Sequence, residues 1–319
     1  MIRLKLSILL LVTVLAAAPQ RVTEGELKVV SNAGGAGEGP SWDPAGFLYF
    51  TGGGKISRLN LQGKVEAFRD PAPGANGSSV DPQKRLVVCE NRKVIRIERD
   101  GSVTVLADNY EGKKFNSPND TSLDSKGRVY FSDPRYGNRS TIEMLDAAGK
   151  QVEGVYRIDA PGKVTRIIHE LDRPNGLLVS PGDRYLYVAD NNNNTEGGAR
   201  KLWRFDLKKD GSVDTGSKKL IFDWRKGRGP DGFKMDRQGR LYVAAGRNKA
   251  SQFETTDEFK SGVYILSPEG KLLEFVAVPT DETTNVAFGG SDLKTLYITS
   301  GGTLYSIRTK TAGRITAVN

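Results

Sequence analysis

The segment "DGFKMDRQGRLYV", residues 231–243, begins with a carboxylate, passes through "DRQG" and ends in an apolar run. Turn-forming residues between two short runs rich in apolar side chains predict a strand, a hairpin turn and a second strand. The turn chemistry explains Pro230 and Gly232 on either side of the carboxylate. It does not explain why Asp231 stands where the first strand begins.

Five other segments align with this one, so the chain contains a repeat. They are "EGPSWDPAGFLYF" (38–50), "NGSSVDPQKRLVV" (76–88), "NDTSLDSKGRVYF" (119–131), "NGLLVSPGDRYLYV" (175–188) and "NVAFGGSDLKTLYI" (285–298). The six polar starts are Glu38, Asn76, Asn119, Asn175, Asp231 and Asn285. Further β-like runs follow, which gives roughly four strands per repeat. Radial repetition of four-stranded sheets protects sheet edges in β-propellers. Six copies therefore predict an all-β, six-bladed β-propeller; a solenoid is the alternative, but solenoid repeats are shorter and more uniform.

The first residues, "MIRLKLSILLLVTVLAAAPQ", have the layout of an export signal. Arg3 and Lys5 precede an apolar run, and small residues follow up to Ala18, which predicts a signal peptide over residues 1–18. A single uncleaved membrane anchor is the alternative, but the run is shorter than the ~20 residues of a bilayer span. We expect an exported protein, periplasmic or secreted, with one propeller domain over residues 22–319 and no stable membrane span after cleavage.

Composition excludes several classes of function. The net charge of +9 is spread through turns and interleaved with acids, so no nucleic-acid partner is expected. One cysteine, Cys89, and one histidine, His169, exclude an internal disulfide and any histidine pair, and they disfavour a Ser-His-Asp triad or a His/Cys zinc site. "TGGGK" is no phosphate loop, because Ile56 follows Lys55 and the first glycine of the motif is missing.

Propeller geometry gives the polar starts a common location. The first strand of each blade lines the central channel, so the six residues should form a ring at one end of it. The second strands return to the same face, where Asp133, Arg135 and Tyr136 should rim the ring. Carboxylate and amide oxygens favour Ca²⁺, Mg²⁺ or Mn²⁺, and a cation would relieve the repulsion between Glu38 and Asp231. The alternative is that these side chains only cap turns.

Such a site suits hydrolysis of an activated ester such as a lactone. A bound cation can polarise a carbonyl and stabilise the oxyanion formed when water attacks. Asp231 would act as the general base toward that water. No nucleophilic serine or cysteine is required.

The motifs "GEGPSWDP", "FNSPNDTSLDSKGRVYFSDPRYG", "RPNGLLVSPGDRYLYVAD", "GPDGFKMDRQGRLYV" and "TTNVAFGGSDLKTLYIT" resemble the gluconolactonase/regucalcin family of six-bladed propellers, from about Leu27 to Thr316. The resemblance implies a small-molecule lactone as substrate and one divalent cation as cofactor, often Ca²⁺, with Mg²⁺, Mn²⁺ or Zn²⁺ as alternatives. It implies Glu38, Asn175 and Asp231 as metal ligands, with Asp231 in the acid/base role. It also implies that Asn119 contacts the substrate or a metal-bound water.

One position departs from the regucalcin-like pattern. Those members carry an arginine two residues before the Asn of the "ND" motif, whereas this chain has Ser117, as in bacterial gluconolactonase-like members. Arg135 and Tyr136 on the rim, beside Asp133, are the candidates for replacing that substrate contact, with packing as their alternative role.

Two further alternatives belong to other functional classes. Propellers similar to strictosidine synthase condense amines with aldehydes. A non-catalytic propeller, braced by the cation, would instead bind a carbohydrate or a protein.

Overall fold

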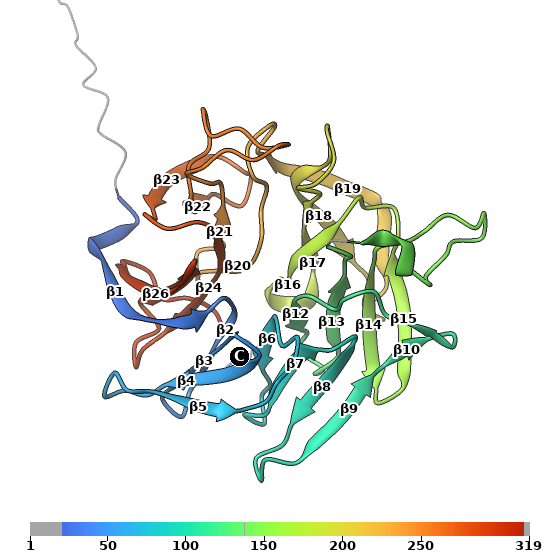
Figure 1. The fold of residues 1–319 in the computed structure, drawn as a ribbon, viewed down its shortest axis with the longest axis horizontal. Coiled ribbons are helices and arrows are strands. Elements are labelled where there is room, and N and C mark those ends of the chain that lie inside the picture. The colour runs from blue at the N-terminus through green and yellow to red at the C-terminus, as the bar shows by residue number, and fades with distance from the viewer. Residues whose placement is uncertain (1–20, 137, 316–319) are drawn as a thin grey trace, which may run out of the picture.

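The computed structural model describes residues 21–136 and 138–315. They form six four-stranded antiparallel sheets around a central axis, which confirms the predicted six-bladed β-propeller (Figure 1). The helical segments of the described part are two short 3-10 turns, η1 (Arg139–Thr141) and η2 (Pro181–Asp183). Within these ranges no helix is long and apolar enough to cross a membrane. The predicted signal peptide, residues 1–18, lies outside the described residues and stays a prediction.

Five blades are built from consecutive strands, numbered from the channel outward. Blade 1 contains β2 (Glu38–Asp43), β3 (Phe47–Gly52), β4 (Lys55–Leu59) and β5 (Val65–Arg69); blade 2 contains β6 (Ser78–Val80), β7 (Leu86–Glu90), β8 (Lys93–Ile97) and β9 (Val103–Ala107). Blade 3 contains β12 (Thr121–Leu123), β13 (Val129–Asp133), β14 (Gly154–Ala160) and β15 (Lys163–Ile168); blade 4 contains β16 (Pro174–Val179), β17 (Tyr185–Asn191), β18 (Arg200–Leu207) and β19 (Val213–Asp223). Blade 5 contains β20 (Phe233–Met235), β21 (Leu241–Ala245), β22 (Gly262–Leu266) and β23 (Leu272–Ala277). A two-stranded hairpin, β10 (Asn109–Tyr110) and β11 (Lys113–Lys114), lies between blades 2 and 3 in sequence.

Blade 6 is closed by the other end of the chain. Its inner strands are β24 (Thr283–Gly289), β25 (Thr295–Ser300) and β26 (Gly302–Thr309), and its outer strand is β1 (Thr23–Ala36). β1 pairs antiparallel with β26, with Val29 opposite Tyr305, and the two lie side by side in Figure 1. The first and last regular segments are therefore fastened into one sheet.

In blades 2, 3 and 5 a carboxylate in the turn shapes the repeated hairpin. In blade 5, Asp236 accepts hydrogen bonds from the backbone N–H groups of Gln238 and Arg240, and from Arg240 Nε at 2.6 Å. Gly239 takes a positive φ of 80°, a conformation that glycine adopts without steric cost. Asp81 and Asp124 bind the arginines four residues on in the same way, whereas the fourth and sixth copies carry Ser180 and Gly290 at this position.

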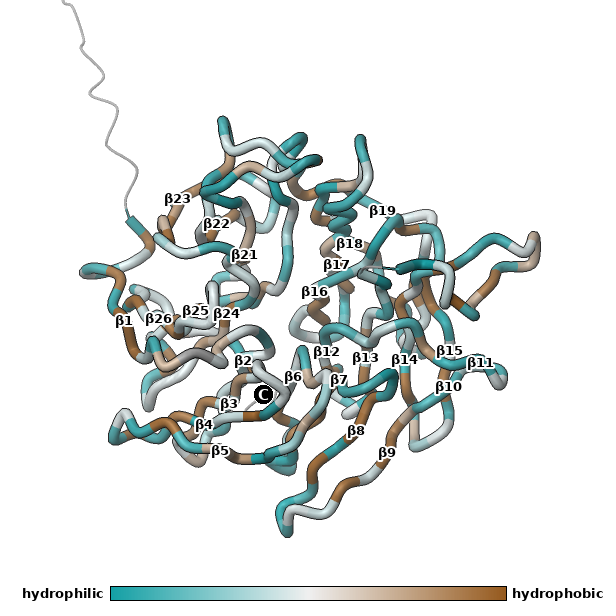
Figure 2. The backbone as a smooth tube through the Cα atoms, viewed as in Figure 1, coloured by the Kyte–Doolittle hydropathy of each residue, from teal (hydrophilic) through white to brown (hydrophobic). Residues whose placement is uncertain are grey.

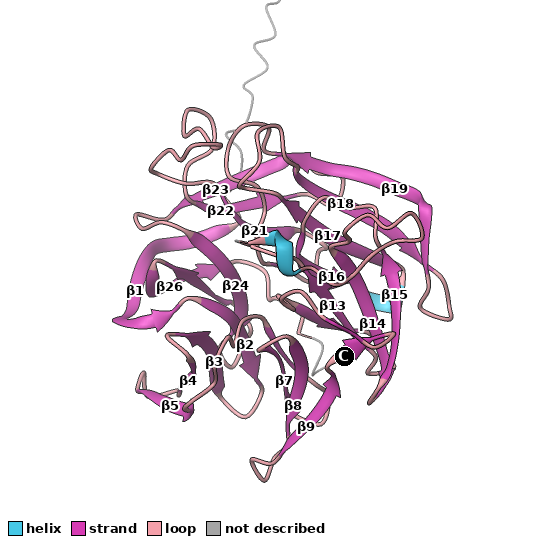
Figure 3. Cartoon of the chain, turned by 45° about the vertical axis from the view of Figure 1, so that its right-hand side comes forward, coloured by secondary structure: helices cyan, strands magenta, loops and turns pink. Residues whose placement is uncertain are grey.

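The apolar core lies between neighbouring blades. Figure 2 shows hydrophobic segments along the strands and hydrophilic ones at the loop tips. Tyr242 of blade 5 and Phe288 of blade 6 pack edge to face, with ring centroids 4.9 Å apart, within one buried cluster. This packing leaves the inner strands, among them β2, β16 and β24, arranged around the channel (Figure 3).

Candidate active site

The six polar starts lie at the beginnings of the inner strands, as predicted. Glu38 is the first residue of β2, and Asp231 stands two residues before β20. Asn119, Asn175, Asp231 and Asn285 are buried, and Glu38 and Asn76 are partly buried. The repeat alignment therefore places these residues correctly at the start of each blade.

The glycine after several of these residues lets the blades approach one another. A Cβ added to Gly176 would overlap the carbonyl oxygen of Asp231, and one added to Gly39 would overlap that of Asn76. Gly77 N–H donates to the carbonyl of Asn119 at 2.7 Å. Glycine is required where backbones come this close, so the repeated glycine tightens the ring.

Two carboxylates are bridged by an amide at the mouth of the channel. Asn285 Nδ2 donates to Glu38 Oε2 at 3.0 Å and to Asp120 Oδ2 at 3.3 Å. Burial, together with the charges of Asp231 and Asp120, raises the pKa of Glu38 well above its usual value. Burial also raises the pKa of Asp120, and the charge of Lys234 opposes that rise. Asp120 was not predicted as a member of this cluster, although it replaces the glycine of four other copies.

Asp231 forms a buried ion pair with an arginine. Arg228, only 3% exposed, donates from Nη2 to Asp231 Oδ2 at 2.5 Å, and its Nε lies 3.1 Å from Glu282 Oε2. Burial raises the pKa of Asp231 to about 6, a rise that Arg228 limits. Asp231 is therefore mainly ionised at neutral pH, with one oxygen engaged by Arg228. Sequence reasoning also missed Arg228, which lies in an ordinary glycine-rich loop.

The Asn175 amide is fixed in one orientation. Its Nδ2 donates to the Tyr136 hydroxyl at 2.7 Å, and that hydroxyl donates to the carbonyl of Asn191 at 3.3 Å. Asn175 is 3% exposed, and its Oδ1 is buried without a hydrogen-bond partner among the described residues. An unsatisfied buried amide oxygen is costly unless another group takes its lone pairs. Tyr136 thus belongs to the site, through its contact with Asn175.

The oxygens present fit a hard divalent cation. Glu38 Oε2 and Asp231 Oδ2 have donors, which leaves one oxygen on each carboxylate beside the unsatisfied Oδ1 of Asn175. A cation would also offset the mutual repulsion that contributes to the high pKa of Glu38. Within the described ranges no cluster of three or more His, Cys, Asp or Glu side chains has metal-binding geometry, and the present set differs in using an amide oxygen.

Asp133 and Arg135 support the loop that leads to Asn119. Asp133, fully buried, accepts from the backbone N–H groups of Asn116 at 2.9 Å and Ser117 at 2.8 Å, and burial raises its pKa to about 7. Arg135 donates to the carbonyl of Asn116 at 3.1 Å. These are contacts within the chain, and a substrate contact by either residue stays a prediction. Ser117 is exposed at the end of this loop.

Fold and site together define a class: six-bladed β-propellers whose channel mouth carries carboxylates and amides from successive blades. The chain belongs to the family described as SMP-30/Gluconolactonase/LRE-like, whose model matches residues 36–302. This confirms the resemblance drawn from the motifs.

Individual relatives agree with this assignment. A gluconolactonase of Zymomonas mobilis subsp. mobilis is 33% identical over 257 residues, which cover 77% of this chain and 65% of that protein, so the chain spans slightly less than two thirds of its relative. The solved structure of a Xanthomonas campestris gluconolactonase is 28% identical with a TM-score of 0.73, covering 89% of each chain. The structure of a calcium-binding regucalcin from Agrobacterium tumefaciens, 19% identical, has a TM-score of 0.70 and covers 90% of this chain and 95% of its own. That last likeness concerns the fold alone.

Proposed function

We propose that the protein is a divalent-metal-dependent lactone hydrolase. The observation that carries the proposal is the buried, unsatisfied Oδ1 of Asn175 beside two carboxylates that each keep an oxygen without a protein donor. Relatives named gluconolactonase support a lactone as substrate. Ca²⁺ is the first cation to test, because carboxylate and amide oxygens are the ligands it prefers.

Glu38, Asn175 and Asp231 would hold the cation. When bound there, it would polarise the lactone carbonyl. Asp231 takes a proton from water as that water attacks the carbonyl carbon. The ring C–O bond then breaks, and the same proton passes to the departing alkoxide, giving a hydroxy acid. Arg228 holds one oxygen of Asp231 throughout, so the second oxygen, with its two lone pairs, would serve both the cation and these proton transfers.

Two neighbouring residues would orient the reactants. Asn119, buried at the start of blade 3, would contact the substrate or the attacking water. Tyr136 fixes the Asn175 amide through its hydroxyl. No arginine stands at position 117, so we expect simple lactones to be accepted alongside sugar lactones.

The test is hydrolysis of D-glucono-δ-lactone and γ-butyrolactone in a pH-stat, corrected for spontaneous opening. The protein is chelated and then supplied with Ca²⁺, Mg²⁺, Mn²⁺ or Zn²⁺. We expect chelation to abolish turnover of at least one lactone and one of the cations to restore it. Asp231→Asn should remain inactive with the cation present, whereas Asp292→Asn, which alters an exposed carboxylate, should remain active.

A protein that binds the cation but hydrolyses no lactone would instead be a metal-braced binding propeller. Metal-independent turnover, or full activity in Asp231→Asn, would contradict the proposed mechanism.

A further inference from the structure

A cavity lined by residues of the inner strands lies farther along the channel than the ring. It has a volume of about 270 Å³. Its walls include the residue three positions after each polar start: Ser41, Ser79, Ser122, Leu178, Lys234 and Phe288. Because the inner strands run along the channel, these six residues form a second ring, which lies deeper in the channel than the ring of polar starts. Lys234 is its one charged member.

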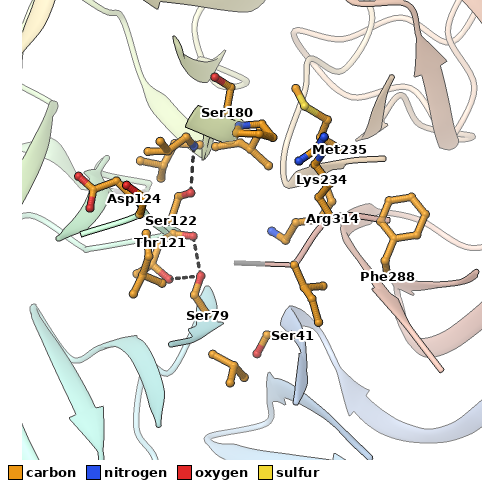
Figure 4. A pocket seen from close by; sticks show the side chains of 18 of the residues that line it. Ser41, Ser79, Thr121, Ser122, Asp124, Ser180, Lys234, Met235, Phe288 and Arg314 are labelled. Atoms are coloured by element: carbon orange, nitrogen blue, oxygen red, sulfur yellow. Dashed lines mark hydrogen bonds between the residues drawn. The ribbon is translucent and has the colours of Figure 1, made fainter. Parts of the chain in front are cut away.

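Two cations contribute to this cavity. Lys234 comes from β20, and Arg314 follows the last strand, where its backbone N–H donates to the carbonyl of Met235. Figure 4 shows both on the side of the cavity opposite Ser79, Thr121 and Ser122. Neither side chain forms an ion pair or a hydrogen bond with another described residue, although both are partly buried. Partly buried cations that lack a bound counter-charge are unfavourable.

The carboxylates of the cavity wall are already engaged. Asp124 accepts from Arg128 Nε at 2.6 Å, and Asp183 accepts from the Ser125 backbone N–H at 3.0 Å and hydroxyl at 2.5 Å. Asp120, which follows the ring residue Asn119, interacts electrostatically with Lys234 but forms no hydrogen bond or ion pair with it among the described residues. In the part of the chain that the structure describes, neither Asp124 nor Asp183 pairs directly with Lys234 or Arg314, so both cations can still bind an anion.

The remaining wall offers hydrogen-bond donors and apolar surface. Ser122 Oγ accepts from the Val179 backbone N–H at 3.0 Å, and no described acceptor takes its hydroxyl hydrogen. Trp42, Leu178 and Phe288 supply apolar surface. A cavity of this size is slightly smaller than most small-molecule sites, which combine apolar walls with a few placed polar groups.

We propose that this cavity is a second ligand site, distinct from the metal ring, that binds a small organic carboxylate between Lys234 and Arg314. Charge-assisted hydrogen bonds to the two cations hold the carboxylate. The apolar wall accommodates its carbon chain, which favours an organic anion over inorganic phosphate.

Isothermal titration of the full-length, Ca²⁺-supplied protein at low ionic strength tests this site. The probes are butyrate, its neutral analogue butyramide, and inorganic phosphate. We expect butyrate to bind in the millimolar range, at least tenfold more tightly than butyramide or phosphate. Lys234→Met and Arg314→Met should each weaken butyrate binding at least tenfold, because each removes one cation. Lys163→Met, which removes an exposed lysine on β15, is the matched control and should leave binding unchanged.

The titration separates this site from the metal ring. Asn175→Ala should bind butyrate as the wild type does, because that residue serves only the ring. Loss of binding in Asn175→Ala, with retention in Lys234→Met and Arg314→Met, would place the anion on the ring and overturn the proposal. Equal binding of butyramide, tighter binding of phosphate, or no binding of butyrate would also overturn it. None of these outcomes depends on lactone hydrolysis.

Discussion

One carboxylate oxygen of Asp231 accepts a hydrogen bond from Arg228, so the two oxygens of this carboxylate have different roles. Arg228 compensates the buried charge and limits the rise in the pKa of Asp231, while the second oxygen remains for a cation or a proton. Arg228 is itself buried, and its charge is compensated mainly by Asp231 and Glu282. The pair is therefore interdependent in a way that exposed ion pairs are not.

Replacing Arg228 with Met should destabilise the protein by about 3 kcal/mol, because it leaves the buried carboxylate of Asp231 without its partner. Arg308→Met, which breaks the exposed pair with Asp292, is the control and should cost less than about 1 kcal/mol. Urea unfolding monitored by tryptophan fluorescence measures both. Equal effects of the two substitutions would contradict the structural role given to Arg228.

Tyr136 should govern cation affinity without contacting the cation. Tyr136→Phe removes the acceptor that orients the Asn175 amide, and we expect the affinity for Ca²⁺ to fall about tenfold, as it does when groups that orient metal ligands are lost. Tyr110→Phe, on the outer hairpin β10, is the control. Calorimetric titration with Ca²⁺ gives both affinities. Unchanged affinity in Tyr136→Phe would mean that this hydroxyl does not orient a ligand.

The alignment of the repeats predicts some of the site residues but not all of them. Asn175 and Asp231 follow from the alignment, because each occupies the same position in its blade. Arg228 could not be found this way, because its contact depends on a loop folding back toward a residue three positions on. Asp133 is the last residue of β13 and is fully buried, and its carboxylate turns toward the backbone of residues 116 and 117.

The inner strands depend on small residues where the blades meet. Gly176 of β16 lies against the carbonyl of Asp231, at the start of the next blade. A side chain there would push apart the two blades that carry Asn175 and Asp231. The geometry of the site is thus set partly by glycine.

Gly176→Ala should destabilise the protein by about 1–3 kcal/mol, the usual cost of overpacking, and should weaken Ca²⁺ binding. Gly216→Ala is the matched control, because a Cβ there would meet only the side chain of Asp214, at 3.4 Å. Thermal unfolding and calcium titration of both variants test this. Wild-type calcium affinity in Gly176→Ala would show that the spacing between these blades does not control the ring.

The hairpin pattern predicted the strand pairing within the blades, but it did not predict how the first and last strands close the propeller. Local turn chemistry determines that β20 pairs with β21. No local signal indicates that β1 pairs with β26, because those strands stand at opposite ends of the chain. Only the closed ring determines which edge needs a partner.

Several carboxylates with a raised pKa lie on the face that carries the ring. Burial raises the pKa of Asp231 to about 6 and that of Asp133 to about 7, and it raises the pKa of Glu38 as well. A carboxyl group with a raised folded-state pKa binds its proton more tightly in the folded state than in the unfolded one. Its stabilisation is present below the unfolded pKa of about 4 and is lost as pH rises through the folded value.

The chelated protein should therefore have a lower free energy of unfolding at pH 7.5 than at pH 5. Carboxyls with a lowered pKa, such as Asp292 at about 2, titrate below this range. Adding Ca²⁺ should raise stability more at pH 7.5, where Glu38 and Asp231 are deprotonated and can bind it. Chemical unfolding at the two pH values, with and without Ca²⁺, gives the comparison. Equal stabilisation by Ca²⁺ at both values would contradict this linkage.

The central claim is that one cation binds between Glu38, Asn175 and Asp231. The most direct measurement is an anomalous difference map from crystals grown with Mn²⁺, recorded for the wild type and for Asn175→Ala. We expect one strong peak coordinated by an oxygen of each of the three side chains, and loss or marked weakening of that peak in the variant. A wild-type crystal with no peak at this position, or a peak that persists unchanged in Asn175→Ala, would contradict the account.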